Sequence, residues 1–508
     1  MPGQINQKAV ARNTLMLYIR MGVMMIVSLY ASRVVLATLG VDDFGIYNVV
    51  GGVVIMFSFM NLTLTVAIRR FLAYELGQEG GGRIQEIFNA SIIAVLITSI
   101  IIAISLESIG LWFLNNKLNI PLDRLTTANF VFQFSVLSFF FNMVLIPFSS
   151  AIVSYEKMDI YAYFGIVETI LKLAFVLALP YLSGDKLKWY GLLIAILAIL
   201  MAICNYLYCC IKVIRPKSLF NYVWDDVFSI FKFSSWTILG TMIFMFATQG
   251  VNMIYNVFFG VAINAALGIA QQVANAVNQF VGNFQTAFNP QLTKSFSAEG
   301  LSERTFGFVC QTSRLSILLI LIIGVPIIAN VSSILEMWLE VVPDYAVPFT
   351  VIFILYIAID GASGPLYYLV YAKGDLKMYQ IVLGIIQVFY VFGVYFLCML
   401  NVCPTYVLSL YVVTGIIIYV ARLFILKNIL NFPIKLFVNR VILPLSIPFL
   451  LFIIIGVANN LFFQNNSILI VLCKIALTFL LVLFISFSIY LKKDEREFVY
   501  SLIKSRLN

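Results

Sequence analysis

The sequence contains no histidine, and no glycine in it is followed by lysine. Without histidine, the usual zinc sites, the serine–histidine and cysteine–histidine nucleophile pairs and imidazole proton relays cannot form. Without a Gly-Lys pair, the phosphate-binding GxxxxGK[ST] loop of ATP-driven motors is missing too. These absences predict a protein that is not an enzyme and that needs no metal or organic cofactor.

Charged residues are scarce as well: they make up 11% of the 508 residues, whereas hydrophobic residues make up 62%. A soluble domain has about 25% charged residues, so this composition cannot cover a water-facing surface. Runs such as 92–104 and 468–490 are apolar without the alternating polarity of a lipid-facing β-barrel. The sequence therefore predicts an all-α, polytopic membrane protein.

Apolar windows of about 20 residues mark candidate transmembrane helices. They predict about fourteen spans, at 14–38, 44–67, 86–113, 128–153, 160–182, 189–211, 229–257, 261–288, 307–334, 348–371, 379–400, 405–427, 440–462 and 467–491. Of the 32 basic residues, 24 are then assigned to the side of the N-terminus, in loops or in the adjoining parts of spans, Arg314 and Arg422 among them. Four fall on the other side (Lys117, Arg124, Lys186 and Lys188) and four inside spans (Arg20, Arg33, Lys172 and Lys474). This asymmetry predicts cytoplasmic termini, and it makes the net charge of +9 a topology signal, not a sign of nucleic-acid binding.

The seven cysteines lie in or beside apolar runs and lack the spacing of metal ligands. We interpret them as small buried hydrophobic residues. A periplasmic disulfide between Cys398 and Cys403 is the alternative.

A short motif occurs twice, which indicates an internal repeat. Leu39-Gly40-Val41 followed by Gly45-Ile46 links the first two spans, and Phe259-Gly260-Val261 followed by Gly268-Ile269 links the seventh and eighth. The repeat unit is six spans. Because six is an even number, the two copies have the same orientation and would be related by an axis along the membrane normal. This predicts an N-terminal six-helix lobe at 1–217, a C-terminal six-helix lobe at 218–430, and two appended helices with a cytoplasmic tail at 431–508.

Polar residues recur at steps of three and four along the eighth span. The stripe comprises Asn264, Gly268, Gln271, Asn275, Asn278, Gly282, Gln285 and Asn289. On a helix these positions share one face, and amides cannot face lipid without losing hydrogen bonds. The stripe therefore either packs against other helices or lines a hydrated cavity, and its length favours the cavity. Thinner polar faces on the second and seventh spans, with Asn48, Ser58 and Thr65 on one and Asn252 on the other, are predicted to line the same cavity.

Charges inside a span cost about 2.5–3.5 kcal/mol each and suggest function. Arg20 and Arg33 on the first span either extend to the two membrane interfaces or bind an anionic group in the cavity. Lys172 follows Glu168 by four residues, which favours an intrahelical ion pair, with a cavity cation as the alternative. Lys474 is close enough to an interface to extend to it.

Asp360 lies near the middle of the tenth span and is followed by Gly361-Ala362-Ser363-Gly364-Pro365. This cluster breaks a helix and frees backbone carbonyls. A carboxylate beside free carbonyls could hold a coupling cation, and a simple kink explains the pattern equally well.

Several segments resemble Wzx-type polysaccharide flippases of the multidrug/oligosaccharidyl-lipid/polysaccharide (MOP) exporter superfamily. They are NTLMLYIR at 13–20, SRVVL at 32–36, LGVDDFGIYNVVGG at 39–52, RFL at 70–72, ELG at 75–77, GIA at 268–270, NFQTAFNPQLTKS at 283–295, MWL at 337–339 and VP at 342–343. The resemblance implies two six-helix bundles in a V around a central cavity, in the bacterial inner membrane. It also implies transport of an undecaprenyl-diphosphate-linked oligosaccharide from the cytoplasmic to the periplasmic leaflet, alongside a polysaccharide polymerase and chain-length machinery.

In that family, basic residues on cavity helices are thought to receive the diphosphate and anionic sugars, which carries over onto Arg20, Arg33 and Arg70. This chain departs from the family at Ile68-Arg69, where a Thr-Gln pair is usual, and at Tyr367-Tyr368, where smaller residues are usual. Arg69 adds a cation near the predicted cytoplasmic mouth, and Lys172 is a further candidate.

Two other functions compete with this interpretation. A flippase for the lipid-linked peptidoglycan precursor would share the fold and the headgroup. A MATE-type drug/cation antiporter would need acids among the cavity helices, and the first span offers basic residues instead. Transport could be coupled to a gradient of H⁺ or Na⁺ or to the membrane potential.

Overall fold

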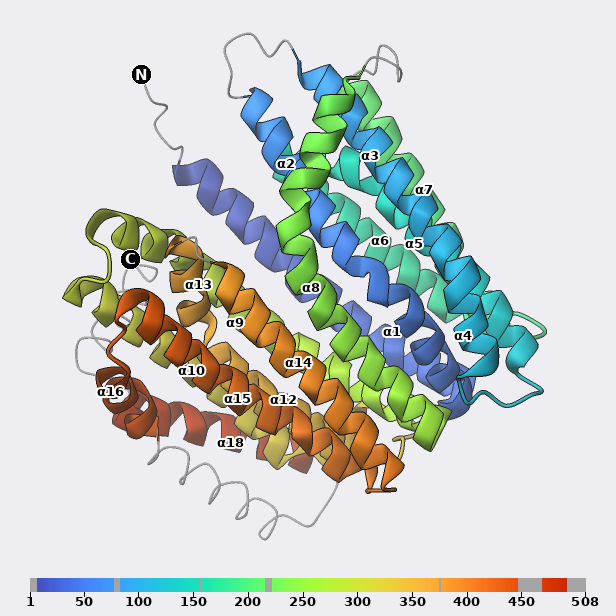
Figure 1. Cartoon of the computed structure of the whole chain (residues 1–508). Coiled ribbons are helices and arrows are strands. Elements are labelled where there is room, and N and C mark those ends of the chain that lie inside the picture. The colour runs from blue at the N-terminus through green and yellow to red at the C-terminus, as the bar shows by residue number, and fades with distance from the viewer. Residues whose placement is uncertain are drawn as a thin grey trace. The chain divides into compact units, whose positions relative to one another are not determined.

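The computed structural model describes residues 7–76, 83–155, 157–214, 222–373, 376–445 and 468–490. Every regular element in these ranges is a helix (Figure 1). The chain divides into two compact units, Met1–Ala265 and Ala266–Asn508. The predicted all-α membrane fold is confirmed.

The described residues of the first unit form eight α-helices. They are α1 (Gln7–Ile55), α2 (Phe59–Leu76), α3 (Ile84–Ser105), α4 (Leu111–Asn116), α5 (Leu125–Ser154), α6 (Met158–Ala178), α7 (Lys186–Lys212) and α8 (Trp224–Phe259). A 3₁₀ turn at Met56–Ser58 separates α1 from α2, and a π-helical turn at Leu106–Gly110 separates α3 from α4. Helix α5 is central, because it packs against α1, α2, α3, α6 and α7.

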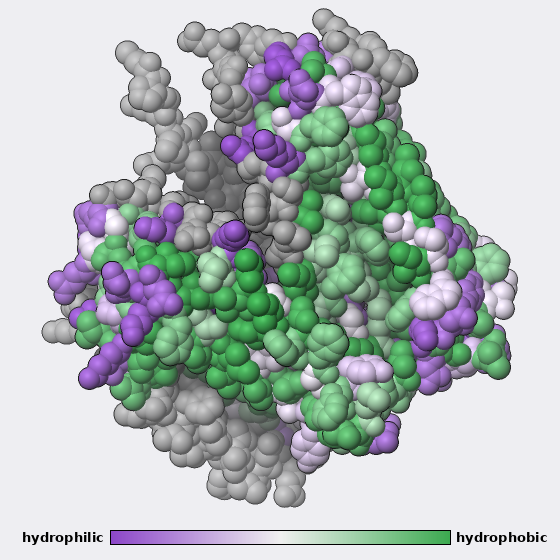
Figure 2. Space-filling model, in the orientation of Figure 1, coloured by the Kyte–Doolittle hydropathy of each residue, from purple (hydrophilic) through white to green (hydrophobic). Residues whose placement is uncertain are grey.

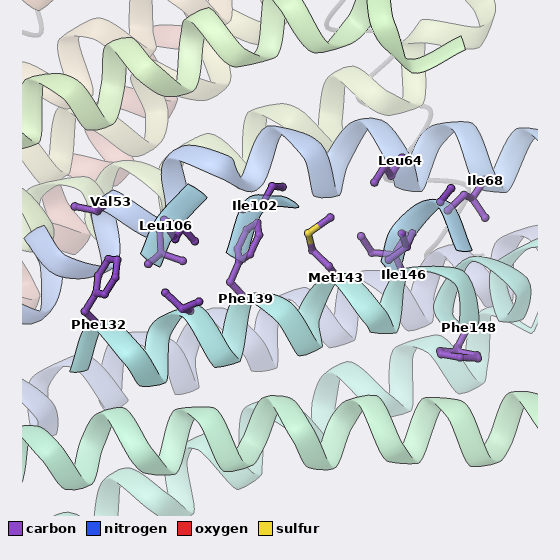
Figure 3. Close-up of a cluster of buried hydrophobic side chains, with 14 of the residues drawn as sticks. Val53, Leu64, Ile68, Ile102, Leu106, Phe132, Phe139, Met143, Ile146 and Phe148 are labelled. Carbon is purple, nitrogen blue, oxygen red and sulfur yellow. The ribbon is translucent and has the colours of Figure 1, made fainter. Parts of the chain in front are cut away.

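Large apolar side chains of α5 form the core of this unit. Phe132, Phe139, Met143 and Ile146 of α5 point toward Leu64 and Ile68 of α2 and Ile102 and Leu106 of the α3 segment (Figure 3). Alanines 90, 94, 128 and 151 are buried among them and let the helix backbones approach one another. In a membrane this dense van der Waals packing holds helices together, since lipid is as apolar as the core.

Two glycines of the repeated motif shape the middle of α1. Gly40 has φ +79°, a left-handed conformation that favours glycine, and it bends the helix between the first two predicted spans. At Gly45 a Cβ atom would overlap the backbone carbonyl of Val261, the first residue of α9. The motif therefore encodes both the bend and a close contact between α1 and the start of α9.

The second unit contains the remaining helices. They are α9 (Val261–Glu299), whose first residues belong to the first unit, α10 (Glu303–Ala329), α11 (Val331–Trp338), α12 (Ala346–Ala362), α13 (Gly364–Lys373), α14 (Leu376–Met399), α15 (Pro404–Leu430), α16 (Ile434–Phe437) and α18 (Ile468–Ile485). Helix α12 packs against α10 and α15, α14 against α15, and α10 against α18. Ser302 caps α10 by accepting a hydrogen bond from the Thr305 amide.

Nine helices of the described residues are long and apolar enough to cross a membrane, or ten if α12 and α13 form one span bent by 43°. Helix α9 is not among them, because its amide side chains lower its hydropathy. Each predicted span except 440–462, most of which lies outside the described residues, falls on helix. On the face shown in Figure 2, hydrophobic residues cover the helices along most of their length, and most hydrophilic residues lie near helix ends.

Helix α8 packs against α1, α2 and α3, so it belongs to the first compact unit. The predicted lobes at 1–217 and 218–430 and the appended segment at 431–508 rest on the repeated sequence motif. The division into compact units rests on packing between helices, so it does not test them. They stay a prediction.

Candidate functional site

A break between α12 and α13 forms the polar centre of the second unit. Ser363 separates the helices, and both its backbone N–H (2.9 Å) and its hydroxyl (2.7 Å) donate to the carbonyl of Asp360. Pro365 is the second residue of α13, where a missing N–H leaves no hydrogen bond unmade. The predicted breaker cluster thus ends one helix and begins the next.

Arg422 of α15 forms an ion pair with the carboxylate at this break. Its Nη1 lies 2.9 Å from Oδ1 of Asp360 and also contacts the Ser363 hydroxyl. The Arg422 side chain is 14% exposed and that of Asp360 is 45% exposed. Arg422 falls inside the predicted span 405–427, on the side assigned to the cytoplasm, and it lies eight residues before the end of α15, about 12 Å along the axis.

Gln285 of α9 reaches the same break. Its Nε2 donates to the carbonyl of Gly361 (2.8 Å) and lies 3.4 Å from the hydroxyl of Ser316. A Cβ atom at Gly364 would overlap the Gln285 side chain, so glycine is needed for this approach. Two residues that the sequence singled out separately, Gln285 and Asp360, therefore belong to one site.

The rest of the predicted stripe on α9 divides into an exposed part and a buried part. Asn275, Asn278 and Gly282 are exposed, and Gln271 is half-buried. Asn264 is fully buried, and its Nδ2 donates to the backbone carbonyl (2.8 Å) and the side-chain oxygen (2.7 Å) of Asn252 on α8. The stripe therefore begins with an interhelical contact and continues as an open amide face.

Asn256 completes the buried amide cluster at the turn between α8 and α9. Its Nδ2 donates to the side-chain oxygen of Asn264 (2.9 Å), and its own side-chain oxygen accepts from the backbone N–H of Asn119 (2.8 Å). Each bond satisfies a polar group inside the first unit. This arrangement supports a packing role for Asn264 in this conformation.

The polar residues predicted on the second span hydrogen-bond within the first unit. Asn48 donates to the carbonyl of Phe44 (2.8 Å) and Thr65 to that of Asn61 (2.6 Å), while the Ser58 hydroxyl lies 3.8 Å from the Met245 sulfur. Bonds to the preceding turn let polar side chains stay within an apolar helix.

Basic side chains gather near the end of α2. Arg69 is half-buried, with its guanidinium 5.6 Å from the centre of the Tyr161 ring, and Arg70 is exposed. Arg33 and Lys172 are half-buried on α1 and α6. The side chains of Arg20 and Asn289 lie outside the part that the structure describes.

A second ionic cluster ties α1, α5 and α7 together. Arg124 donates from Nε to Oδ1 of Asp43 (2.9 Å) and from its terminal nitrogens to Asp185 (3.3 Å). Asp185 also accepts from the Thr127 hydroxyl (2.6 Å) and from the Leu187 N–H (3.1 Å), so it caps α7. Partial burial disfavours the Asp185 carboxylate, but the Thr127 hydrogen bond and the charge of Arg124 outweigh it and lower the pKa of Asp185.

Helix α18 is attached to α10 by buried polar groups. Nη2 of Arg314 donates to the carbonyl of Tyr490 (2.6 Å), and Nδ2 of Asn330 lies 3.4 Å from the Thr478 hydroxyl. Arg314, which falls inside the predicted span 307–334, lies within α10 and is 3% exposed, and Lys474, predicted to extend to an interface, is 5% exposed.

The two cysteines considered for a disulfide are not bonded. Cys398 is buried and Cys403 is exposed, and both are free thiols. The alternative of a Cys398–Cys403 bridge was therefore wrong for this structure. Among the described residues, no group of three or more cysteine or acidic side chains could hold a metal ion.

The structure is similar to solved structures of membrane transporters. It matches the lipid II flippase MurJ in an inward closed conformation with a TM-score of 0.63 and 17% identity, over 92% of this chain and 98% of that chain. It matches an inward-facing multidrug resistance MATE family transporter with a TM-score of 0.58 and 11% identity, over 85% of this chain and 97% of that chain. A MOP superfamily transporter from Pyrococcus furiosus gives a TM-score of 0.55 and 13% identity, over 83% and 96% of the two chains.

No protein-family model matches the sequence, and a search of curated proteins also gives no match. At identities this low, the likeness to solved structures is one of fold. The chain is a multi-pass membrane protein, and its fold is that of the MOP-superfamily transporters.

Proposed function

We propose that this protein is a flippase that moves an undecaprenyl-diphosphate-linked polysaccharide repeat unit from the cytoplasmic to the periplasmic leaflet of a bacterial inner membrane. The observation that carries the proposal is the exposed amide face of α9. Asn275 and Asn278 are exposed on α9, a helix of 39 residues. Because lipid cannot satisfy amides, this face requires water or a polar ligand, and sugar hydroxyls match amide donors and acceptors.

The diphosphate would bind to the basic residues of the first unit. Guanidinium groups form two parallel hydrogen bonds with phosphate oxygens. The ring of Tyr161 holds the Arg69 guanidinium in place, and the next residue, Arg70, is exposed. Arg20, Arg33 and Lys172 are the further cations assigned to the diphosphate and to anionic sugars.

The membrane potential supplies a driving force without ATP. Moving one negative charge out of a cell interior at −100 mV is favourable by about 2.3 kcal/mol, and a diphosphate headgroup carries about two such charges. In an alternating-access cycle the headgroup would cross with the protein while the lipid tail stays in the bilayer. A polysaccharide polymerase and chain-length machinery would act on the product.

A flippase for the lipid-linked peptidoglycan precursor is the second candidate. Its support is the likeness to the lipid II flippase MurJ over nearly the whole of both chains. A MATE-type antiporter has less support, because such an antiporter would need an acidic residue available in its cavity and the carboxylate of Asp360 is paired with Arg422.

Complementation of a strain that lacks its repeat-unit flippase tests the proposal. The wild type should restore surface polysaccharide, and Arg70→Ala should reduce it at least tenfold at equal membrane abundance. Arg304→Ala is the matched control, because that side chain is 85% exposed and its Glu299 contact is long, at 4.0 Å. In a strain depleted of its peptidoglycan-precursor flippase, rescue of peptidoglycan synthesis without rescue of surface polysaccharide in the first strain would favour the second candidate. Hydrolysis of a lipid-linked diphosphate by the purified protein would overturn both.

A further inference from the structure

The helix break in the second unit has the oxygen atoms of a cation site, but three of them already accept hydrogen bonds. Oδ1 of Asp360 accepts from Arg422, and the Asp360 carbonyl accepts twice from Ser363. The carbonyl of Gly361 accepts from Gln285. Hard cations bind where several oxygens converge on them, and here those oxygens face fixed donors. The residues present therefore do not fit a coupling cation.

We propose that Arg422 is the resident cation of this site, so that its guanidinium stands where a transporter coupled to Na⁺ or H⁺ would bind the external ion. This inference rests on the proposed function for its meaning, because coupling matters only in a transporter. It predicts that Asp360 binds no external cation while Arg422 is present.

Close packing of α15 on α12 places the two partners of the ion pair at the same level of the helices. A Cβ atom at Gly415 would lie 3.0 Å from Cδ2 of Tyr356, so glycine lets α15 approach α12 closely at this level. Arg422 lies seven residues after Gly415 and Asp360 four residues after Tyr356, and both spacings return to the same helix face. The close approach of α15 to α12 therefore brings Arg422 and Asp360 together.

The chemistry of arginine makes the neutralisation permanent. A guanidinium keeps its proton at any physiological pH, and the Nη1 of Arg422 contacts both the carboxylate of Asp360 and the Ser363 hydroxyl. A lysine could lose its proton, and a bound Na⁺ could dissociate. Arg422 does neither, so the second unit would complete its cycle without taking up an ion at Asp360.

Removing the arginine should expose the site that it fills. In Arg422→Gln the carboxylate loses its counter-charge, while Ser363 and the Gly361 carbonyl stay nearby. We expect this variant to acquire a requirement for Na⁺ or for protonation of Asp360. The double variant Asp360→Asn/Arg422→Gln has no charge to neutralise and should lose that requirement again.

Thermal unfolding of the purified full-length protein measures this directly and independently of flippase activity. Melting temperatures would be compared in NaCl and in choline chloride of equal ionic strength at pH 8, and again at pH 6. We expect no Na⁺-dependent shift that depends on Asp360 in the wild type. We expect a rise of about 2–3 °C with Na⁺ or on acidification in Arg422→Gln, which corresponds to an ion at about 100 times its Kd.

Glu107→Gln serves as a matched control, because Glu107 is another carboxylate within a predicted span and bonds to Gln133 (2.9 Å). Its melting temperature should respond to Na⁺ and to pH as that of the wild type does.

A Na⁺-dependent stabilisation of the wild type that Asp360→Asn removes would overturn the inference. A folded Arg422→Gln whose melting temperature responds neither to Na⁺ nor to acidification would overturn it too. If Arg422→Gln does not fold in choline chloride at pH 8, NaCl or pH 6 should restore a cooperative melt, and failure to do so while Asp360→Asn/Arg422→Gln folds would count against the inference. Failure of complementation would bear on the proposed function and leave these melting temperatures unchanged.

Discussion

Arg124, which immediately precedes α5, donates from Nε to Oδ1 of Asp43, three residues after the bend of α1 at Gly40. The same guanidinium contacts Asp185 at the start of α7, so one cation joins the bend of α1 to the starts of α5 and α7. Its side chain is 27% exposed, which leaves it partly shielded from solvent.

Arg124→Gln should destabilise the protein by about 1–3 kcal/mol, because two partly buried carboxylates lose a charged donor. Lys117→Ala should have little effect, since Lys117 is exposed and its recorded contact is a Trp112 ring 5.8 Å away. Thermal unfolding in detergent would measure both. Equal melting temperatures for the two variants would contradict a structural role for Arg124.

Asp185 predicts how stability depends on pH. Its pKa is lowered in the folded protein, so its contribution is complete above the unfolded value of about 3.9 and is lost as pH falls through the folded value. The difference in melting temperature between wild type and Asp185→Asn should therefore be constant from pH 7 to about 5 and shrink below about 4. A difference that grows on acidification would contradict the assignment.

Gly45→Ala should destabilise the protein by about 1–3 kcal/mol, because its Cβ would overlap the Val261 carbonyl and the backbone there cannot yield cheaply. Gly51→Ala on the same helix is the matched control, since no atom lies within 4 Å of its Cβ. The control should be neutral or slightly stabilising, as alanine favours helix. Melting temperatures that fall equally would show that helix α1 tolerates no substitution, and that the contact with Val261 is not the cause.

Asn264 and Asn275 should behave differently although they share one stripe. Asn264→Leu removes one hydrogen-bond partner from the half-buried amide of Asn252 and one from the buried amide of Asn256, and should cost about 1–3 kcal/mol of stability. Asn275→Leu changes an exposed residue and should keep the melting temperature but lower complementation. Full activity of Asn275→Leu, together with that of Asn278→Leu, would remove the α9 face from the transport path.

The sequence predicted local features well and distant partners poorly. The bend at Gly40, the break after Asp360 and the amide face of α9 all follow from residues close together in the chain. Arg422 and Asp360 are 62 residues apart, and Arg124 and Asp43 are 81 apart. Nothing in a local pattern distinguishes a cation near a helix end that faces water from one that faces a carboxylate on another helix.

The same limit explains the amide stripe. Asn264 and Asn275 have the same residue type and lie on the same face by spacing, yet one is buried against α8 and the other is exposed. Only the turn at Gly260, with φ +83°, brings Asn264 back onto Asn252 and Asn256. The sequence contained Gly260, but it did not show which residues of α8 and α9 the turn would bring into contact.

The pairing of Asp360 with Arg422 has a consequence for how the protein is made. The ribosome adds about 5–20 residues per second, and the two partners are 62 residues apart. Helix α12 thus leaves the ribosome about 3–12 s before α15 can supply the positive charge. During biogenesis the Asp360 carboxylate therefore has no arginine partner for several seconds, and the second unit can reach its final packing only after α15 has entered the membrane.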